Sequence, residues 1–505
     1  MEYLLMLYAE EGGWTKMSKT EQEQGMAAYT AYTEALKKAG VWNRCRRPGR
    51  SAILGVAMPG GGTRNGRSAT DLEHRTQRGI LASATAGFLM ADGENVERAR
   101  SAAESAARRS YGKLVAFLAA RTRDVAAAED ALSEAFASAL NDWPVSGCPA
   151  NPEGWLLTVA RRKLIDAMRG RQRHEVAAEE LRVMAEGAEM AQTDTRLPDQ
   201  RLGLMFACAH PAIEAGIRSP LILQVVLGLD AKAIASAFLT SPAAMGKRLV
   251  RAKEKIREAG IPFAIPERRE LPARLDAVLE AIYAGFSEGW SDPSATDISR
   301  RDLSEETLFL ARLVVELLPD EAEALGLLAL MLHADARRFA RRTSAGEYVP
   351  LSKQDIQLWD AELIREAEEL LLRASELGVM GRFQLEGALQ SAHVHRRRTG
   401  AGNWREVVQL YDALLAVSGS PVVGINRALA LAEVEGPGAG LRELDDLAKD
   451  TRLGEYQPYW AARAELLARA GDYPEAKRCY ELAIGLEREE AVRRFLLQQA
   501  AGLPE

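Results

Sequence analysis

The stretch from Ser219 to Arg257 constrains the fold of this chain more than any other part of it. A small, apolar helical pattern, Ala231 to Phe238, is followed by the turn Leu239-Thr240-Ser241. Ser241 is a good N-cap, and Pro242 takes the first position of a second predicted helix. Spacings of three and four residues predict one buried stripe on that helix: Met245, Leu249, Ala252 and Ile256.

The opposite side of the second helix is basic and carries Lys247, Arg248, Arg251 and Lys255. A short helix, a tight turn and a helix with a basic outer face predict a helix-turn-helix, whose second helix can enter the major groove of DNA. These four residues and Ser241 are therefore candidate DNA contacts. The alternative is a surface helix with solvated charges, because look-alikes of this motif are common.

The bulk properties predict several globular domains in the cytoplasm. The chain has 505 residues, 47% of them hydrophobic, and a net charge of −6, so any affinity for nucleic acid must come from local patches. The four cysteines, Cys45, Cys148, Cys208 and Cys479, lie far apart, which argues against disulfides and zinc sites. We expect no signal peptide, no membrane span and no metal or other cofactor.

Two histidine-containing patterns deserve a structural interpretation. Cys208 and His210 could suggest a ligand pair, but helix-end packing is favoured because zinc needs further ligands. His393 and His395 lie in a basic tail and are predicted to be solvated.

Residues 1–40 predict a small α/β segment, with a strand from Glu2 to Ala9 and a helix from Thr20 to Ala39. The opening MEYLLMLYAEE resembles the YCII-related, DGPF-type family, which implies a ferredoxin-like fold; the resemblance stops near Trp42, so we predict a partial domain. Residues 41–100 form a Gly/Arg-rich linker or degenerate segment. Residues 61–68 match a phosphate loop except that Arg67 replaces the lysine, so a linker is favoured over nucleotide binding.

The chain becomes strongly helical from about Arg98. An acidic helix from Asp124 to Phe136 should bury Leu132 and Phe136, and Trp143-Pro144 should end it. A later helix, Trp155 to Arg171, has an aromatic start and a dense basic end.

The segments AEDALSEAF and NPEGWLLTVARRKLIDAMR, followed by the helix-turn-helix, resemble an extracytoplasmic-function sigma factor. Its regions two and four would span residues 101–172 and 197–262, with a linker at 173–196. The resemblance implies that core RNA polymerase binds the acidic helix, through Glu129, Asp130, Glu134 and Phe136. It also implies that promoter DNA contacts the next helix at the −10 element, through Trp155, Arg161, Arg162, Lys163 and Arg169, and that the helix-turn-helix reads the −35 element.

Two residues depart from the family pattern. Ser133 stands where a Gln is usual, and Arg162 replaces an Asn, which weakens base-specific −10 contacts but adds charge toward phosphates. Trp155 could instead be a core tryptophan, and Asp130 with Glu134 could be a solvated helix face.

The remainder of the chain predicts helices: an extension at 263–400, including Ser352 to Leu377, and repeats at 401–505. The segments GNWREVVQLY and GDYPEAKRCY resemble each other, with a looser copy between them, at spacings close to that of tetratricopeptide repeats. A stacked solenoid that binds a protein partner or docks on the same chain is favoured over an ordinary helical bundle.

The predicted fold is therefore mainly all-α, with a small α/β N-terminus, a region-two helical domain, a helix-turn-helix domain and a tetratricopeptide-like solenoid. The predicted function is a sigma factor that binds core RNA polymerase and directs promoter-specific initiation, with the C-terminal extension as a regulatory module. The alternative is a helix-turn-helix regulator with a solenoid sensor that does not join polymerase. No acid/base or nucleophile set is visible, so we do not expect an enzyme.

Overall fold

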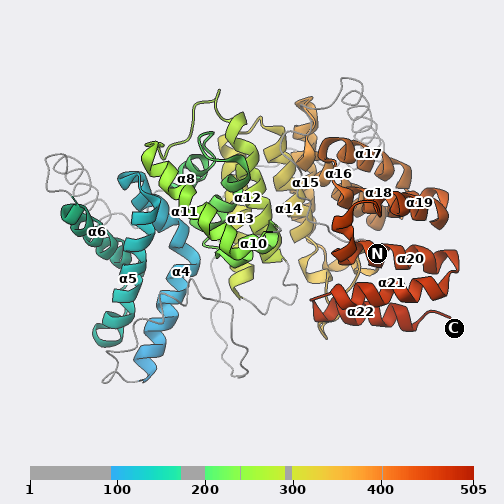
Figure 1. Cartoon of the computed structure of the whole chain (residues 1–505), viewed down its shortest axis with the longest axis horizontal. Coiled ribbons are helices and arrows are strands. Elements are labelled where there is room, and N and C mark those ends of the chain that lie inside the picture. The colour runs from blue at the N-terminus through green and yellow to red at the C-terminus, as the bar shows by residue number, and fades with distance from the viewer. Residues whose placement is uncertain (1–92, 172–198, 239, 291–297, 401, 505) are drawn as a thin grey trace. The chain divides into compact units, whose positions relative to one another are not determined.

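The computed structural model describes residues 93–171, 199–238, 240–290, 298–400 and 402–504 (Figure 1). Within those ranges the regular structure is helical, apart from an isolated bridge between Arg342 and Tyr348. The prediction of a mainly all-α chain is confirmed for them. The α/β segment predicted at residues 1–40, the linker predicted at 173–196 and most of the segment at 41–100 lie outside the described residues.

The chain divides into two compact units. The described residues up to Gly285 belong to one unit, and those from Phe286 onward belong to the other. Helix α12 (Pro272–Trp290) runs across this division.

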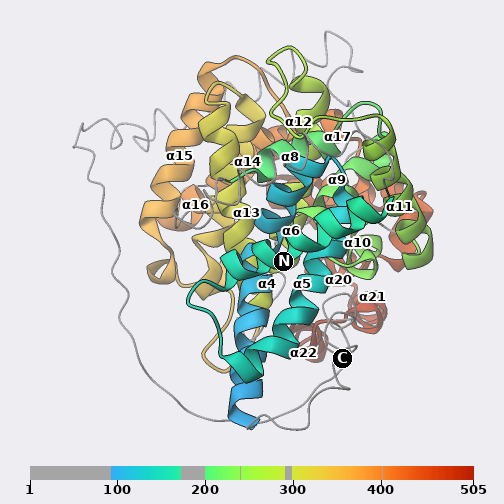
Figure 2. The ribbon, with the colours of Figure 1, turned by 90° about the vertical axis from the view of Figure 1, so that its left-hand side faces the viewer.

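The first unit begins with three packed helices, α4 (Gly93–Thr122), α5 (Val125–Ser146) and α6 (Pro152–Arg171). Figures 1 and 2 both show α4 and α5 side by side, and α6 packs on both of them. All three helices supply large buried side chains to one core, among them Leu114, Phe117, Leu132, Trp143, Leu156 and Leu164. This shared apolar core fixes which faces of α5 and α6 remain exposed.

The ends of α5 show which local signals decide its length. Asp124 is the N-cap and accepts a hydrogen bond from the Ala127 backbone amide at 3.0 Å. The predicted stop at Trp143-Pro144 is wrong, because Pro144 lies inside the last turn and the helix continues to Ser146. Gly147, with φ of 86°, ends it by donating its amide to the Trp143 carbonyl at 2.9 Å.

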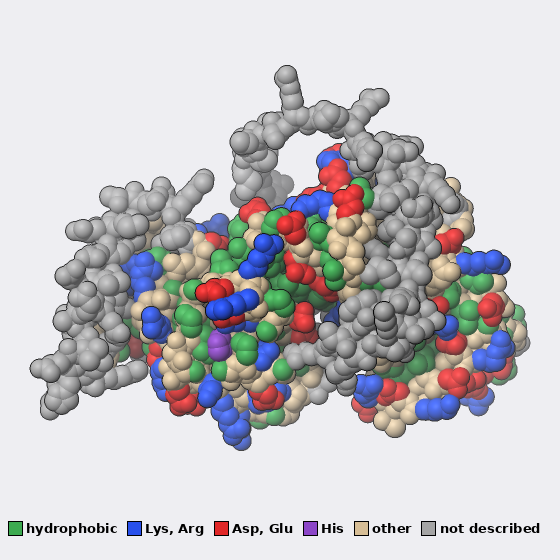
Figure 3. Space-filling view, turned by 90° about the horizontal axis from the view of Figure 1, so that it is seen from above, with side chains coloured by type: hydrophobic (Ala, Val, Ile, Leu, Met, Phe, Trp, Pro, Cys, Tyr) green, Lys and Arg blue, Asp and Glu red, His purple; other side chains and the backbone are tan. Residues whose placement is uncertain are grey.

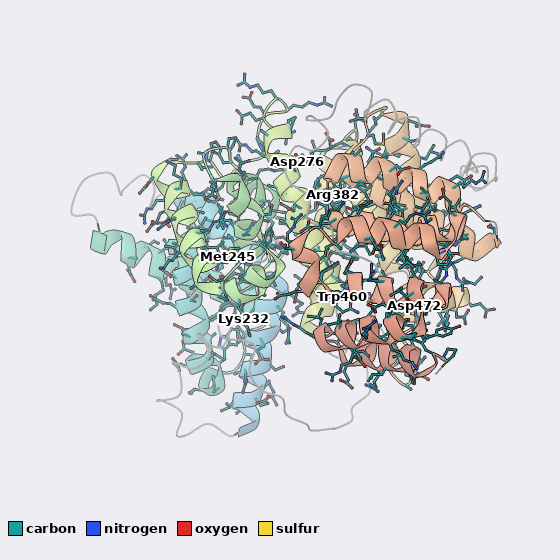
Figure 4. All side chains as sticks on the ribbon, turned by 45° about the vertical axis from the view of Figure 1, so that its right-hand side comes forward. Lys232, Met245, Asp276, Arg382, Trp460 and Asp472 are labelled. Atoms are coloured by element: carbon teal, nitrogen blue, oxygen red, sulfur yellow. The ribbon has the colours of Figure 1, made fainter. Side chains whose placement is uncertain are left out.

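The same unit continues with α8 (Arg201–Cys208), α9 (Ala215–Val225), α10 (Ala231–Ala237) and α11 (Pro242–Glu258). The Ser241 hydroxyl caps α11 by accepting from the Ala244 amide at 3.3 Å. The stripe predicted from the spacing is the buried face of α11: Met245 (labelled in Figure 4), Leu249, Ala252 and Ile256. The sequence pattern therefore predicted both the start and the orientation of this helix.

The two helical groups of the first unit pack directly against each other. Helix α8 packs on α4, and α11 packs on α5. Gly112 on α4 lies so close to the Val226 carbonyl oxygen that an added Cβ would overlap it. This close approach requires a glycine and shows that the contact between the two groups is tight.

The second unit is a succession of helices, coloured from yellow to red in Figure 1, in which neighbours along the chain pack together. Their bounds are α13 (Ile298–Leu317), α14 (Ala322–Asp335), α15 (Ala361–Glu376), α16 (Arg382–Thr399), α17 (Trp404–Ser418), α18 (Pro421–Glu435), α19 (Pro437–Leu447), α20 (Gln457–Ala470), α21 (Tyr473–Leu486) and α22 (Glu490–Ala501).

Two predictions for the second unit are wrong. The helix predicted from Ser352 begins only at Ala361, because Asp360 caps α15, and the residues before it form short 3-10 turns, Leu351–Lys353 and Ile356–Leu358. His393 is not solvated. It is 6% exposed and packs edge-on against Trp404, with ring centroids 6.2 Å apart, because α16 turns this position toward α17.

Candidate nucleic-acid and polymerase interface

The outer face of α11 carries three exposed basic side chains at intervals of one helical turn: Lys247, Arg251 and Lys255. Because the opposite face is fully buried, these cations project away from the body of the unit. The Ser241 hydroxyl, also predicted to contact DNA, already caps the helix. The arrangement offers a row of positive charge along a well-anchored helix, from its second turn to its last.

Arg248 lies beside this row and has a different role in the structure. Its guanidinium donates to Glu214 Oε1 at 3.1 Å and to the Gly216 carbonyl at 3.0 Å. These bonds tie α11 to the start of α9. Arg248 is therefore engaged within the protein, and we assign it to positioning α11 rather than to the free basic row.

A buried ion pair joins α11 to the acidic helix α5. Lys253 Nζ lies 2.6 Å from Glu129 Oε2, and the two side chains are only 13% and 14% exposed. Burial raises the pKa of Glu129, while Lys253 acts in the opposite direction. At the outer edge of the same contact, Arg257 lies 3.9 Å from Asp124. In this arrangement Glu129 serves the packing of α11 on α5.

Sequence reasoning missed Lys253, although its position carried a signal. It follows Ala252 and lies one turn after Leu249, at the edge of the buried stripe. A lysine at that edge should meet a partner when the stripe packs. The partner's identity could not be read locally, because Glu129 is 124 residues away in the sequence.

The other acidic residues predicted to bind polymerase divide into two groups. Asp130 and Glu134 are exposed on α5, and Glu134 pairs with Lys163 at 3.1 Å. This pair is largely solvated, so it contributes little stability and is easily exchanged for another partner. Phe136 is 4% exposed and belongs to the core, so the prediction that it contacts polymerase is corrected.

Helix α6 presents Arg162 and Lys163 to solvent, as the DNA prediction requires. Trp155 is half-buried and packs edge-on against the buried Trp143, with centroids 5.4 Å apart and an interplanar angle of 68°. Its ring is therefore held in place by the core while part of it stays exposed. The helix includes Arg169, whose side chain lies outside the described residues.

Arg161 is the exception on α6. Its side chain lies with the guanidinium carbon 4.9 Å from the Phe117 ring centroid, and the residue is 6% exposed. Burial, with a smaller effect of Arg121, lowers the pKa of Arg161 to about 10. The prediction that it tracks phosphates is therefore corrected, since burial leaves Arg161 to the packing of α6 on α4.

The described surface carries no broad field of one sign on the face in Figure 3, where basic and acidic side chains are interspersed. Cys208 is buried at the end of α8, and His210 Nδ1 accepts from the Ala212 amide at 3.1 Å, which confirms helix-end packing. In the described ranges no group of three His, Cys, Asp or Glu side chains could hold a metal ion. No described helix combines the length and apolar character that a membrane span needs.

Two known protein families match parts of this chain. The model of sigma-70 region 2 matches residues 107–174, which cover α5, α6 and the second half of α4. A family of unknown function (DUF6596) matches residues 274–375, from α12 to α15. No solved structure matches the chain.

An uncharacterized protein of Rhizobium meliloti (strain 1021) is 36% identical over 383 residues, which cover 75% of this chain and 90% of that protein. The similarity therefore extends well beyond the region-2 match. The chain belongs to the same family as this protein, and its region 2 makes it a sigma-70 family factor, a protein of transcription initiation.

Proposed function

We propose that the chain is a promoter-specificity subunit of the extracytoplasmic-function type, acting in the cytoplasm by binding rather than by catalysis. In this proposal α4–α6 dock on core RNA polymerase and engage the −10 element. Helices α10 and α11 form the helix-turn-helix of region four and read the −35 element. The observation that carries the proposal is the region-2 match on α4–α6, followed by a second, basic-faced helix pair in the order that such factors require.

The exposed acidic side chains of α5 would bind polymerase. Asp130 is solvent-facing, and Glu134 can exchange its partner Lys163 for a cation on polymerase. Glu129 joins this surface only when Lys253 releases it. In the proposed docking surface Asp130 and Glu134 are therefore accessible to polymerase, and Glu129 becomes accessible once its ion pair with Lys253 breaks.

Promoter engagement requires the two helical groups of the first unit to separate. The names of the two elements place them about 25 base pairs apart, or about 85 Å at about 3.4 Å per base pair. In the described arrangement α11 and α5 touch through Lys253 and Glu129. The proposal therefore includes an opening step, in which this ion pair is broken before both elements are bound at once.

Each DNA contact has a separate chemical basis. The exposed part of Trp155 offers a stacking surface for an unpaired base, and Arg162 and Lys163 lie on the same helix to meet phosphates. Lys247 and Arg251 project from α11, where a duplex groove would receive them. Single-stranded and duplex DNA would thus be bound by different helices.

We further propose that the C-terminal helices form a tetratricopeptide-like solenoid that binds a protein partner or the sigma core. The repeated segments begin helices α17 and α21, and Asp472, labelled in Figure 4, caps α21 by accepting from the Glu475 amide. Ala476 and Ala483 are fully buried, which lets neighbouring helices approach closely. Deleting this extension should change promoter output or polymerase affinity, and unchanged values of both would remove the regulatory proposal.

The polymerase proposal is tested by reversing one exposed charge. Asp130→Arg should abolish copurification with core RNA polymerase, because it places like charge against a basic partner. Asp446→Arg is the matched control, since Asp446 is an exposed acid on α19 in the other unit. Copurification of Asp130→Arg at the level of the control would refute docking through α5.

A further inference from the structure

The outward face of α11 contains one apolar side chain that its packing does not use. Val250 is 57% exposed, whereas Leu249, next to it, is 1% exposed. From Lys247 to the end of α11, every other exposed position carries a charge. Single exposed aliphatic residues are ordinary on protein surfaces. Val250, however, lies on the face of α11 that is proposed to contact DNA.

Helical geometry places Val250 within the basic row. Lys247, Val250 and Arg251 follow the spacing i, i+3 and i+4, which puts them on one face within one turn. Glu254 continues that face a turn later. Val250 therefore lies one turn after Lys247 and next to Arg251, and the acid Glu254 follows it one turn later.

This pattern limits where DNA can lie along α11. Beyond Arg251 the exposed positions alternate in charge, because Glu254 and Glu258 stand among Lys255 and Arg257, so the part of the helix that is free of acids and best suited to phosphates ends at Arg251. Recognition helices contact base edges with their N-terminal residues, which agrees with a footprint that ends near Arg251. Val250 then lies inside the footprint, toward its end.

An aliphatic side chain has one apolar partner on base edges in the major groove, the C5-methyl group of thymine. The other groups displayed there are hydrogen-bond donors and acceptors, which a valine cannot satisfy. Lys247 and Arg251 can hold the backbone or a guanine on either side. We propose that Val250 reads a thymine methyl group in the duplex element and so sets specificity at one base pair. This inference rests on the proposed function of α11.

The test uses core RNA polymerase carrying the full chain, with duplexes enriched by this complex from a random-sequence pool. Each thymine of the enriched element is then replaced singly by deoxyuridine, which lacks only the methyl group. The wild type should lose about fourfold in affinity at one position, the effect of burying roughly one methyl group. Val250→Ala should bind the thymine duplex about fourfold more weakly and should not distinguish thymine from deoxyuridine there.

Ile265→Ala is the control, because Ile265 is an aliphatic residue, 46% exposed, outside α11. It should keep the preference for thymine at the same position. The inference is overturned if the wild type distinguishes the two bases at no position, or if Val250→Ala retains the full preference. A complex that enriches no duplex element at all would instead refute the proposed function of α11, and the inference with it.

Discussion

The buried ion pair between Lys253 and Glu129 gives the sharpest test of how α11 is held on α5. Lys253→Met keeps the length of the side chain and removes its charge. Glu129 would then be left buried, with a raised pKa and with Asp130 as its near neighbour. Removing one partner of a buried pair typically destabilises a protein by about 3–5 kcal/mol. We expect Lys253→Met to lower the free energy of unfolding by about 3 kcal/mol, the lower end of that range, because both side chains keep some exposure.

Hydrogen–deuterium exchange on the full chain measures this effect locally. A loss of about 3 kcal/mol in opening free energy corresponds to exchange about 10²-fold faster, since about 1.4 kcal/mol is tenfold. The increase should appear in peptides from α5 and α11. Helices α20 and α21 of the other unit serve as the internal reference and should not change.

The unpaired charge on Glu129 also determines how the defect depends on pH and which second substitution should reverse it. A buried carboxyl with a raised pKa destabilises the fold as pH rises toward and through that pKa, so the defect of Lys253→Met should shrink as pH falls toward 5. The double variant Lys253→Met with Glu129→Leu should recover most of the protection, because it leaves no unpaired charge. Unchanged protection in the single variant, or a double variant as unprotected as the single one, would refute the reasoning.

Three further outcomes are expected. Leu249→Ala should destabilise the first unit by about 2–5 kcal/mol, because it opens a cavity under α11; faster exchange confined to that unit would be the measurement. Lys247→Ala and Arg251→Ala should each reduce the salt slope of duplex binding by about 0.9, and an unchanged slope in both would contradict their phosphate contacts. Trp155→Ala should impair promoter opening, measured by permanganate reactivity, more than initial binding; equal losses would favour a purely core role.

Much of α11 could be predicted because its signals are local. The N-cap at Ser241 and the spacing of Met245, Leu249 and Ile256 depend only on neighbouring residues, and the structure follows them. The same holds for the start of α10 at Ala231 and for the inward-facing Leu132 and Phe136 of α5. The region-2 segment was also predictable, since the family model matches residues 107–174 where residues 101–172 were predicted.

The errors arise where a side chain's role depends on distant packing. The charge of Arg161 predicts a phosphate contact, but its side chain is buried against the Phe117 ring on α4. The basic neighbours of His393 predict a solvated side chain, but Trp404 of α17 packs against it. Pro144 was read as a helix stop, but the last turn accommodates it and Gly147 ends the helix. None of these partners is visible in the local sequence.

The central claim is that this chain directs core RNA polymerase to start sites. Run-off transcription on fragments of genomic DNA, with core polymerase and with or without the full chain, tests it most directly. We expect discrete transcripts that appear only with the chain and disappear with Asp130→Arg. A chain that neither associates with core polymerase nor produces a defined transcript from any fragment would contradict it.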